Sequence, residues 1–265
     1  MIRKKQFLSI ALCLCMICAI QPVPARADVA SISGTTVKAE KIGATSFNIV
    51  GLDGRKEYRT TFMNGGYTTA VSVDGGTLQN NAGSLIASGL ELDVQLEVWE
   101  DNFIKVIYTL SNTGAKAHNV KLGSHADVMI GRNDKAPICA TEEGGNRLSM
   151  IGAPKNKYAF KLIADSCSTI WYGFYSKRIE NCFTDMTDRG PSNVYKKDSG
   201  LAYSWDINIS PGGTWTSYVL IGTGDLEQMN IAIPPIPQPE PVIPQPSIEL
   251  STSEVYFTED DTLPS

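Results

Sequence analysis

The feature that most constrains the fold is a strict alternation of apolar and polar residues from Leu90 to Val98. Apolar side chains occupy the even positions, and acidic or amide side chains occupy the odd positions between them. This period of two is typical of a β-strand with one buried and one solvated face. The apolar face returns twice, after turn signals at 100–102 and 112–114, in Ile104, Val106, Tyr108, Leu110, Val120, Leu122, Ala126, Val128 and Ile130. We therefore predict an antiparallel meander of three strands, and its continuous apolar face requires a second sheet to cover it.

Further segments carry strand patterns separated by Gly, Pro, Asn and Asp turn signals. They are residues 46–52, 57–63, 67–73, 147–151, 158–164, 169–175, 201–209 and 215–221. No segment has a convincing amphipathic helical pattern. The predicted fold is therefore all-β, an antiparallel β-sandwich of the supersandwich type over residues 45–224. Residues 28–44 are polar and rich in small side chains, so we expect a loose lead-in there.

The N-terminus has the layout of an export signal. Three basic residues at positions 3–5 precede an apolar run from Phe7 to Ile20, and Ala25–Ala27 forms an A-x-A cleavage motif. The apolar run is too short to span a bilayer comfortably. We predict a signal peptide at residues 1–27, cleavage after Ala27, and a protein that is secreted or displayed at the cell surface. No later segment of the sequence is apolar enough to predict a membrane span.

Charge is distributed unevenly along the chain. Removal of residues 1–27 takes away four basic and no acidic residues, which changes the net charge from −5 to −9. Eight acidic and no basic residues lie from Asp225 onward, so residues 28–224 carry a net charge of only −1. A nucleic-acid partner would require a basic stripe, and the sequence has none. The nearly neutral body also gives no support for attraction to anionic lipid.

The C-terminal part of the sequence is rich in proline. Residues 225–247 are predicted to be a linker, because seven prolines lie between Pro234 and Pro246. Such a segment favours extended polyproline II and spans about 40 Å at about 3.1 Å per residue. Residues 248–265 are expected to be either the start of a truncated further module or a disordered tail.

Three cysteines lie after the predicted cleavage site, at Cys139, Cys167 and Cys182. An odd number in an exported protein leaves at least one thiol unpaired. Cys167 and Cys182 are the candidate disulfide. The alternative is three buried, reduced cysteines, because a core of this size does not need a disulfide.

The most polar short cluster is a candidate metal site. Asp127, Asn133 and Asp134 offer oxygen ligands of the kind that Ca²⁺ prefers. His125 shares a strand face with Asp127, and a simple hairpin register would place both beside Lys105. The alternative is structural: Asp127 pairs with a basic neighbour, and Asn133 and Asp134 cap a turn. The spacing matches no known calcium loop.

A second candidate site combines aromatic and acidic residues around the long segment 176–199, which has no clear period. Faces of Tyr and Trp can stack on a sugar ring or a peptide. The candidate ligand-binding residues are Tyr172, Asp185, Asp188, Tyr195 and Asp198. Tyr203 and Trp205 are instead predicted to be core residues, because they share the apolar face of an alternating strand.

Several segments together resemble the N-terminal β-sandwich module of secreted bacterial cell-surface, adhesin-like proteins, over about residues 45–224. The segments are His125–Gly131, Asn133–Asp134, Ala136–Ile138, Trp171–Tyr175, Arg178, Asn181, Phe183, Ser199–Trp205 and Pro211–Gly212. The resemblance implies a module that precedes immunoglobulin-like or repeat domains and has no assigned activity. A weaker likeness, at the level of fold alone, is to galactose-mutarotase-like supersandwich domains.

Two functions follow from these observations. The first is a non-catalytic surface module that binds an extracellular ligand, either a glycan or a surface protein, without a cofactor other than Ca²⁺. The second is a carbohydrate-active domain of the mutarotase-like or glycoside-processing type. The sequence has no G-x-S-x-G, H-E-x-x-H or phosphate-loop motif, so we predict no catalytic residues and favour the first function. A carboxylate within hydrogen-bonding distance of His125 in an acidic cleft would favour the second.

Overall fold

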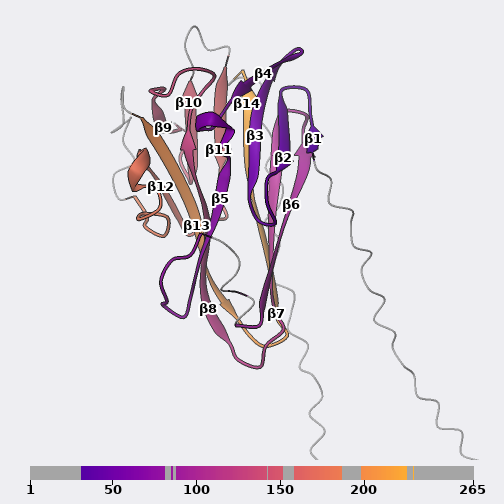
Figure 1. Cartoon of the computed structure of the whole chain (residues 1–265), viewed down its shortest axis with the longest axis vertical. Coiled ribbons are helices and arrows are strands. Elements are labelled where there is room, and N and C mark those ends of the chain that lie inside the picture. Colours follow the sequence, from indigo (N-terminus) through magenta and orange to yellow (C-terminus); the bar gives the residue numbers. More distant parts are fainter. Residues whose placement is uncertain are drawn as a thin grey trace, which may run out of the picture.

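In the computed structural model, two antiparallel sheets pack against each other as a sandwich (Figure 1). The structure describes residues 31–80, 85, 88–141, 143–151, 158–186, 198–225 and 229. The larger sheet has the order β1 (Ser31–Ser33), β2 (Val37–Lys41), β3 (Phe47–Asp53), β5 (Tyr67–Val73), β8 (His118–Val128), β13 (Ser199–Ile209) and β12 (Thr169–Phe174), and β4 (Lys56–Arg59) also pairs with β3. The smaller sheet has the order β6 (Leu90–Trp99), β7 (Phe103–Asn112), β14 (Thr214–Gly224), β11 (Ala159–Ile163), β10 (Arg147–Ile151) and β9 (Ile138–Ala140). Two short 3-10 turns, η1 (Phe62–Asn64) and η2 (Tyr175–Lys177), connect strands. The predicted all-β sandwich is confirmed.

The core lies between the two sheets and contains the apolar face predicted from the alternation. Ile104, Val106 and Leu110 of β7 are fully buried, as is Leu122 of β8. Tyr203 and Trp205 of β13 belong to the same core cluster, so their prediction as core residues is confirmed. Val98, at the end of β6, is 37% exposed although it shares the apolar face. The period-two pattern therefore identified the buried face along most of the length of these strands.

The predicted three-stranded meander is wrong in its last step. β6 and β7 pair as predicted, but the chain then crosses to the other sheet, where β8 pairs with β5 and β13. The apolar pattern specifies which face of a strand is buried and not which strand lies beside it, so both arrangements satisfy it. One consequence concerns His125, whose register partners are Thr68 and Ala202 and not Lys105, which lies in the smaller sheet.

The structure also contains strands where none was predicted. The expected loose lead-in contains β1 and β2, which form one edge of the larger sheet. Their polar composition is compatible with a strand at an edge, where Val37 and Ala39 alone supply the buried face of β2. The short strand β9 lies in a part of the chain where the sequence pattern predicts no strand, and it pairs with β10. Three-residue strands are too short to produce a detectable alternation.

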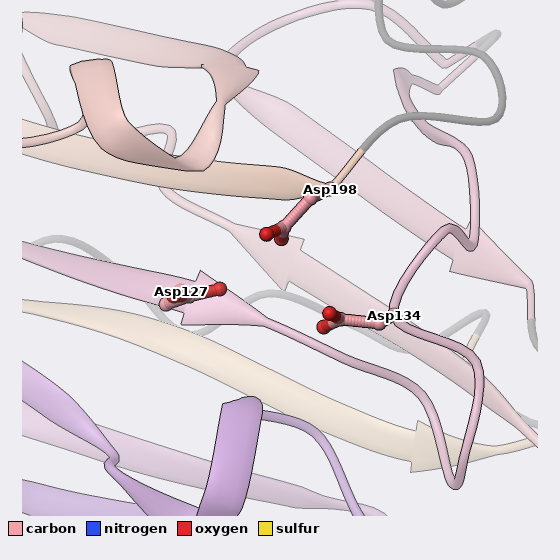
Figure 2. Close-up of side chains that lie close together, drawn as sticks. All are labelled: Asp127, Asp134 and Asp198. Carbon is pink, nitrogen blue, oxygen red and sulfur yellow. The ribbon is translucent and has the colours of Figure 1, made fainter.

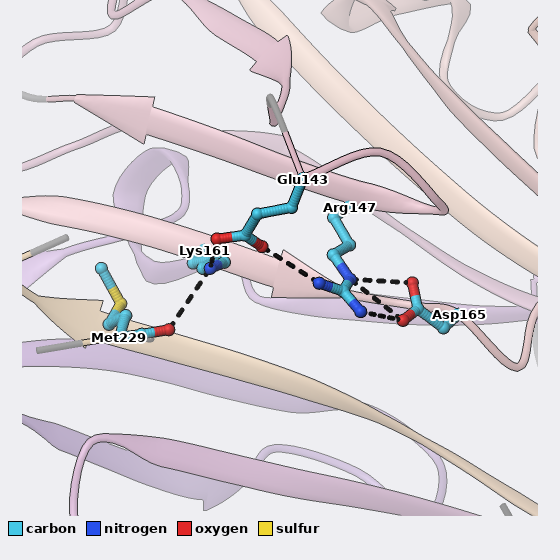
Figure 3. A network of polar contacts seen from close by, with 5 residues as sticks. All are labelled: Glu143, Arg147, Lys161, Asp165 and Met229. Atoms are coloured by element: carbon cyan, nitrogen blue, oxygen red, sulfur yellow. Dashed lines mark hydrogen bonds and ion pairs between the residues drawn. The ribbon is translucent and has the colours of Figure 1, made fainter. Parts of the chain in front are cut away.

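Residues 1–30 and 230–265 lie outside the described residues, and with them the predicted signal peptide and the proline-rich segment. Met229, at the start of the predicted linker, is described and is fully buried in a second apolar cluster with Phe103 and Leu220. Its backbone carbonyl accepts a hydrogen bond from Lys161 Nζ at 3.3 Å (Figure 3). The chain at this point therefore contacts the smaller sheet. Among the residues that the structure describes, no helix has the length and apolar character needed to span a bilayer.

Candidate functional site

Three aspartates from separate segments converge at one end of the larger sheet (Figure 2). Asp127 is the penultimate residue of β8, Asp198 directly precedes β13, and Asp134 lies in the loop between β8 and β9. Each offers one carboxylate oxygen, and these oxygens lie within 4.8 Å of one another. We call this group the three-aspartate site.

Local structure explains why these residues meet. β8 and β13 are antiparallel neighbours, so the end of β8 and the beginning of β13 lie side by side. After β8 a tight turn reverses the chain: Ile130 and Asn133 exchange backbone hydrogen bonds of 3.2 and 2.9 Å, with Gly131 at a φ of 62°. A positive φ of this kind is favourable for glycine, which has no side chain to clash. The turn returns Asp134 toward Asp127.

The three carboxyl groups lie in an environment that disfavours their ionised form. Burial, followed by the charge of Asp198, raises the pKa of Asp127 to about 6. Burial also raises the pKa of Asp198, with Asp134 contributing, and burial raises the pKa of Asp134. The Oδ1 atom of each of the three is buried and has no hydrogen-bond partner among the described residues. Buried, unpartnered carboxylate oxygens are costly unless a proton, a cation or a ligand satisfies them.

Arg178 is the basic residue whose charge acts on two of the three carboxyl groups. Its charge lowers the pKa of both Asp127 and Asp198 and so offsets part of the effect of burial. Its guanidinium donates a hydrogen bond from Nη1 to the carbonyl of Tyr175 at 2.8 Å and also lies 5.8 Å from the centre of that ring. The turn η2, which precedes Arg178, packs against β8 and β13. Lys135 likewise lowers the pKa of Asp134. Two cationic side chains therefore act on three carboxyl groups, and a fully ionised site carries a net negative charge.

His125 lies two residues before Asp127 on the same face of β8 and is only 3% exposed. Its Nε2 atom is 3.2 Å from Oδ1 of Asn80, and its buried Nδ1 atom has no partner among the described residues. Burial, together with the charge of Arg178, lowers its pKa to about 4, so the ring is neutral at physiological pH. The hydrogen-bond partner found for His125 is thus an amide and not the carboxylate that would have favoured a carbohydrate-active site.

The donor set of the three-aspartate site fits a hard divalent cation. Ca²⁺ binds carboxylate oxygens at about 2.3–2.6 Å, so two ligands of one ion lie at most about 5 Å apart. The observed limit of 4.8 Å satisfies this condition. Three carboxylates supply three of the six to eight oxygens that Ca²⁺ takes. The remaining positions would be available to water or to a ligand.

The structure brings together residues that the sequence placed in two different candidate sites. Asp127 and Asp134 came from the predicted metal set, and Asp198 came from the predicted ligand set. The third predicted metal ligand, Asn133, instead accepts a hydrogen bond from the backbone N–H of Lys135 at 3.1 Å, as expected for a residue that stabilises a turn. Sequence reasoning did not connect Asp198 to Asp127, because their proximity depends on the pairing of β8 with β13.

Of the other predicted ligand-binding residues, the structure describes two, Tyr172 and Asp185. Tyr172 is 1% exposed and packs in the core cluster with Ile170. Asp185 accepts a hydrogen bond from the backbone N–H of Ile170 at 3.1 Å and so satisfies a backbone donor at the edge of β12. Asp188 and Tyr195 lie outside the described residues. The burial of Tyr172 contradicts its predicted role in ligand contact.

The cysteines are unpaired thiols in the structure. Cys167 and Cys182, the candidate disulfide, are both buried and belong to different apolar clusters. Burial raises the pKa of both thiols, and that of Cys182 reaches about 12. Cys167 and Cys182 thus pack as small apolar side chains, whereas Cys139 is only half-buried and its Sγ lies 3.8 Å from the carbonyl of Ser149.

The chain matches no model of a known protein family, and it matches no curated protein. Among solved structures it is similar to a bacterial glucoamylase complexed with acarbose, at 9% identity and a TM-score of 0.43, over 74% of this chain and 32% of the glucoamylase. It is also similar to a protein from the human microbiome assigned as a kojibiose phosphorylase, at 7% identity and a TM-score of 0.40, over 74% of this chain and 30% of the other. The chain thus spans about a third of the length of these proteins. At these identities and TM-scores neither match assigns an activity to it.

Proposed function

We propose that this protein is a secreted, non-catalytic binding module that holds a Ca²⁺ ion in the three-aspartate site. The observation that carries the proposal is the convergence of three carboxylates, each with a buried oxygen that lacks a partner. A bound cation would satisfy these oxygens and remove the repulsion between their charges. The predicted signal peptide supports an extracellular location, where Ca²⁺ is abundant enough for sites with dissociation constants of about 10⁻⁴–10⁻³ M.

The cation would also provide the contact to an extracellular ligand. Ca²⁺ has more coordination positions than the three carboxylates fill, and oxygen atoms of a glycan or of a surface protein can occupy the remainder. The exposed Phe174, which ends β12, and the half-buried Tyr175, which begins η2, have ring centres 5.0 Å apart, and the guanidinium of Arg178 lies 5.8 Å from the ring of Tyr175. Aromatic faces of this kind can pack on the apolar side of a sugar ring. These features favour a glycan as the ligand.

The test is titration of the full mature chain with CaCl₂ at pH 7.5. Isothermal calorimetry measures binding, and the melting temperature is measured with and without CaCl₂. We expect saturable binding and a higher melting temperature, because a ligand that binds only the folded state stabilises it. Asp134→Asn should weaken binding at least tenfold. The matched control is Asp206→Asn, since Asp206 is an exposed residue of the same sheet that pairs with Lys121 at 2.7 Å. Equal Ca²⁺ binding by wild type and Asp134→Asn would contradict the proposal.

A second candidate function is glycoside processing, and one observation favours it. The raised pKa of Asp127, about 6, beside further carboxylates is a property of general acids in such enzymes. Incubation with a panel of reducing and non-reducing oligosaccharides in the presence of EDTA separates the two functions. Hydrolysis or anomer exchange that Asp127→Asn abolishes would replace the binding function with a catalytic one.

A further inference from the structure

The free edges of the two sheets differ in how well they are protected. An edge strand presents unpaired N–H and C=O groups to solvent, and proteins usually shorten or cover such edges. β1 and β9 are edges of only three residues each. The edge of β12 is covered, because Met186 donates a backbone hydrogen bond to the carbonyl of Ile170 at 3.1 Å, and the N–H of Tyr172 lies 3.2 Å from Sδ of Met186. These three edges offer little room for another strand.

β6 is the exception. It is ten residues long, pairs with β7 along its whole length, and ends the smaller sheet (Figure 1). Among the described residues, none makes a backbone hydrogen bond to the side of β6 that faces away from β7. β1 of the larger sheet lies close to β6, and Thr35 and Thr36 donate backbone hydrogen bonds to the carbonyl of Asp101 in the turn after β6. The alternate backbone groups of β6 that point away from β7 nevertheless have no backbone partner among the described residues, along a strand about 33 Å long. A strand of this length can accept a complete additional strand.

The inner face of β6 is incompletely covered. Leu92 and Leu96 are only partly buried and Val98 is 37% exposed. On the adjacent β7, by contrast, Ile104, Val106 and Leu110 are fully buried. Apolar side chains of an added strand would lie beside the β6 residues and remove their remaining apolar surface from water, which is favourable.

The outer face of β6 is acidic. Glu91 and Asp93 lie on this face with Gln95, and Gln95 Nε2 donates a hydrogen bond to Asp93 at 2.6 Å. Glu97 lies on the same face, opposite Lys105 of β7 in the register. Carboxylates along an edge disfavour pairing with a second copy of the same strand, because like charges would lie opposite one another. The same charges favour an incoming strand with basic side chains at alternate positions.

We propose that the free edge of β6 binds an extended segment of another protein by strand addition, and that this segment alternates Lys or Arg with apolar residues. Main-chain hydrogen bonds to β6 would supply affinity, and the alternation would supply specificity, because basic side chains would face the carboxylates while apolar side chains cover Leu92, Leu96 and Val98. This contact lies on the smaller sheet, whereas the three-aspartate site belongs to the larger one. It is therefore independent of Ca²⁺ binding.

The test uses a fluorescent synthetic decapeptide that alternates Lys and Val, added to the full mature chain in 150 mM salt and EDTA. We expect saturable binding by fluorescence anisotropy. A peptide that alternates Glu and Val should bind at least tenfold more weakly. A Lys–Val peptide with N-methyl groups on alternate residues should also bind at least tenfold more weakly, because it lacks the N–H donors along one edge. Equal binding of the N-methylated peptide would overturn strand addition, since a purely electrostatic contact does not need backbone donors.

Protein variants localise the contact. The double variant Glu91→Lys, Asp93→Lys reverses two exposed charges on β6 and should reduce the affinity for the Lys–Val peptide at least tenfold. The matched control, Glu180→Lys, reverses an exposed charge that follows η2 and should bind within about twofold of wild type, provided both variants keep the wild-type circular dichroism spectrum. Unchanged binding by the β6 variant would overturn the proposal. So would dimerisation of wild type through β6, measured by sedimentation and abolished by the same substitutions, because the occupant would then be a second copy.

Discussion

Gly200 of β13 lies opposite Asp127 of β8 in the sheet register, and the absence of a side chain at Gly200 allows the turn η2 to lie directly on the sheet. A Cβ atom at Gly200 would be 2.9 Å from the Cα atom of Tyr175 and 3.2 Å from Cβ of Arg178. The backbone N–H of Tyr175 also donates to the carbonyl of Asp198 at 3.1 Å. The position of Arg178 near the three-aspartate site therefore depends on a glycine in the neighbouring strand.

Gly200→Ala should displace η2 from the sheet. Contact with a backbone atom at 2.9 Å cannot be relieved by rotating a side chain, so we expect a loss of about 1–3 kcal/mol in the free energy of unfolding, measured by urea denaturation. Displacement of Arg178 should raise the pKa of Asp127 further. The control is Gly43→Ala, where the nearest atom to an added Cβ is the Cβ of Ser46 at an ordinary 3.6 Å. Equal stability of the two variants would show that η2 does not rest on Gly200.

The raised pKa of Asp127 predicts a pH dependence of stability. In the unfolded chain its pKa is near the ordinary value of 3.8, and in the folded chain burial raises it to about 6. Between these values the folded state binds the proton more tightly, so this carboxyl group causes stability to fall as the pH rises from 4 to 6. Asp127→Asn removes the ionisation. In EDTA, we expect the stability of the variant relative to wild type to increase over this pH range, and a constant difference would contradict the prediction.

Calcium binding should show the opposite pH dependence. A proton on Asp127 competes with the cation, so affinity should fall as the pH falls through 6. One proton with this pKa makes binding about tenfold weaker at pH 5 than at pH 7. Calorimetric titration with CaCl₂ at both values measures the ratio. Equal affinity at the two pH values would exclude Asp127 as a ligand that must lose its proton.

The sequence predicted the buried faces well and the neighbours of the strands poorly. Alternation identified the inward positions of β7, β8 and β13, because burial of one face is a local property of each strand. It could not show that β8 leaves the sheet of β7, since pairing between distant strands is decided by the packing of the whole sandwich. The same limit explains the site: Asp127 and Asp134 are close in sequence, but Asp198 joins them only through the pairing of β8 and β13. Tyr172 was predicted to contact a ligand because an aromatic face can stack on a sugar or peptide, but its side chain is buried in the core.

The two sheets are also joined by a buried polar contact. The hydroxyl groups of Tyr108 in β7 and Tyr203 in β13 are 2.9 Å apart, and that of Tyr108 is 2.8 Å from Oγ of Ser124. Tyr203→Phe leaves a buried hydroxyl with one partner fewer, so we expect a loss of about 1–3 kcal/mol in the free energy of unfolding. Each single variant leaves the other tyrosine hydroxyl without this partner, whereas the double variant with Tyr108→Phe removes both hydroxyls. The double variant should therefore lose less unfolding free energy than the sum of the two single variants. Strict additivity would show that the two hydroxyls are not coupled.

The last prediction concerns Lys161, a residue of β11 that is only 4% exposed (Figure 3). Its Nζ atom donates to Glu143 at 2.7 Å, and Glu143 is also 3.1 Å from Nη1 of Arg147, which in turn contacts Asp165. Glu143→Gln would leave a buried ammonium group without its carboxylate, and we expect a loss of about 3 kcal/mol at pH 7. Lys161→Met should lose less, because the new side chain is apolar, lies beside the cluster of Phe103 and Met229, and leaves Glu143 paired with Arg147.

The pH dependence of this pair provides its control. The hydrogen bond from Lys161 holds the pKa of Glu143 below its ordinary value of 4.5. A lowered pKa in the folded state contributes stability at neutral pH that is lost as the pH falls through the folded value. The difference between wild type and Glu143→Gln should therefore shrink below pH 4 in urea denaturation experiments. Glu180→Gln, in the exposed pair with Lys177, should cost less than about 1 kcal/mol at any pH. A larger loss of unfolding free energy in Lys161→Met than in Glu143→Gln would show that the ammonium group stabilises the fold chiefly through the carbonyl of Met229. The chain at Met229 would then be held more by this hydrogen bond than by apolar packing.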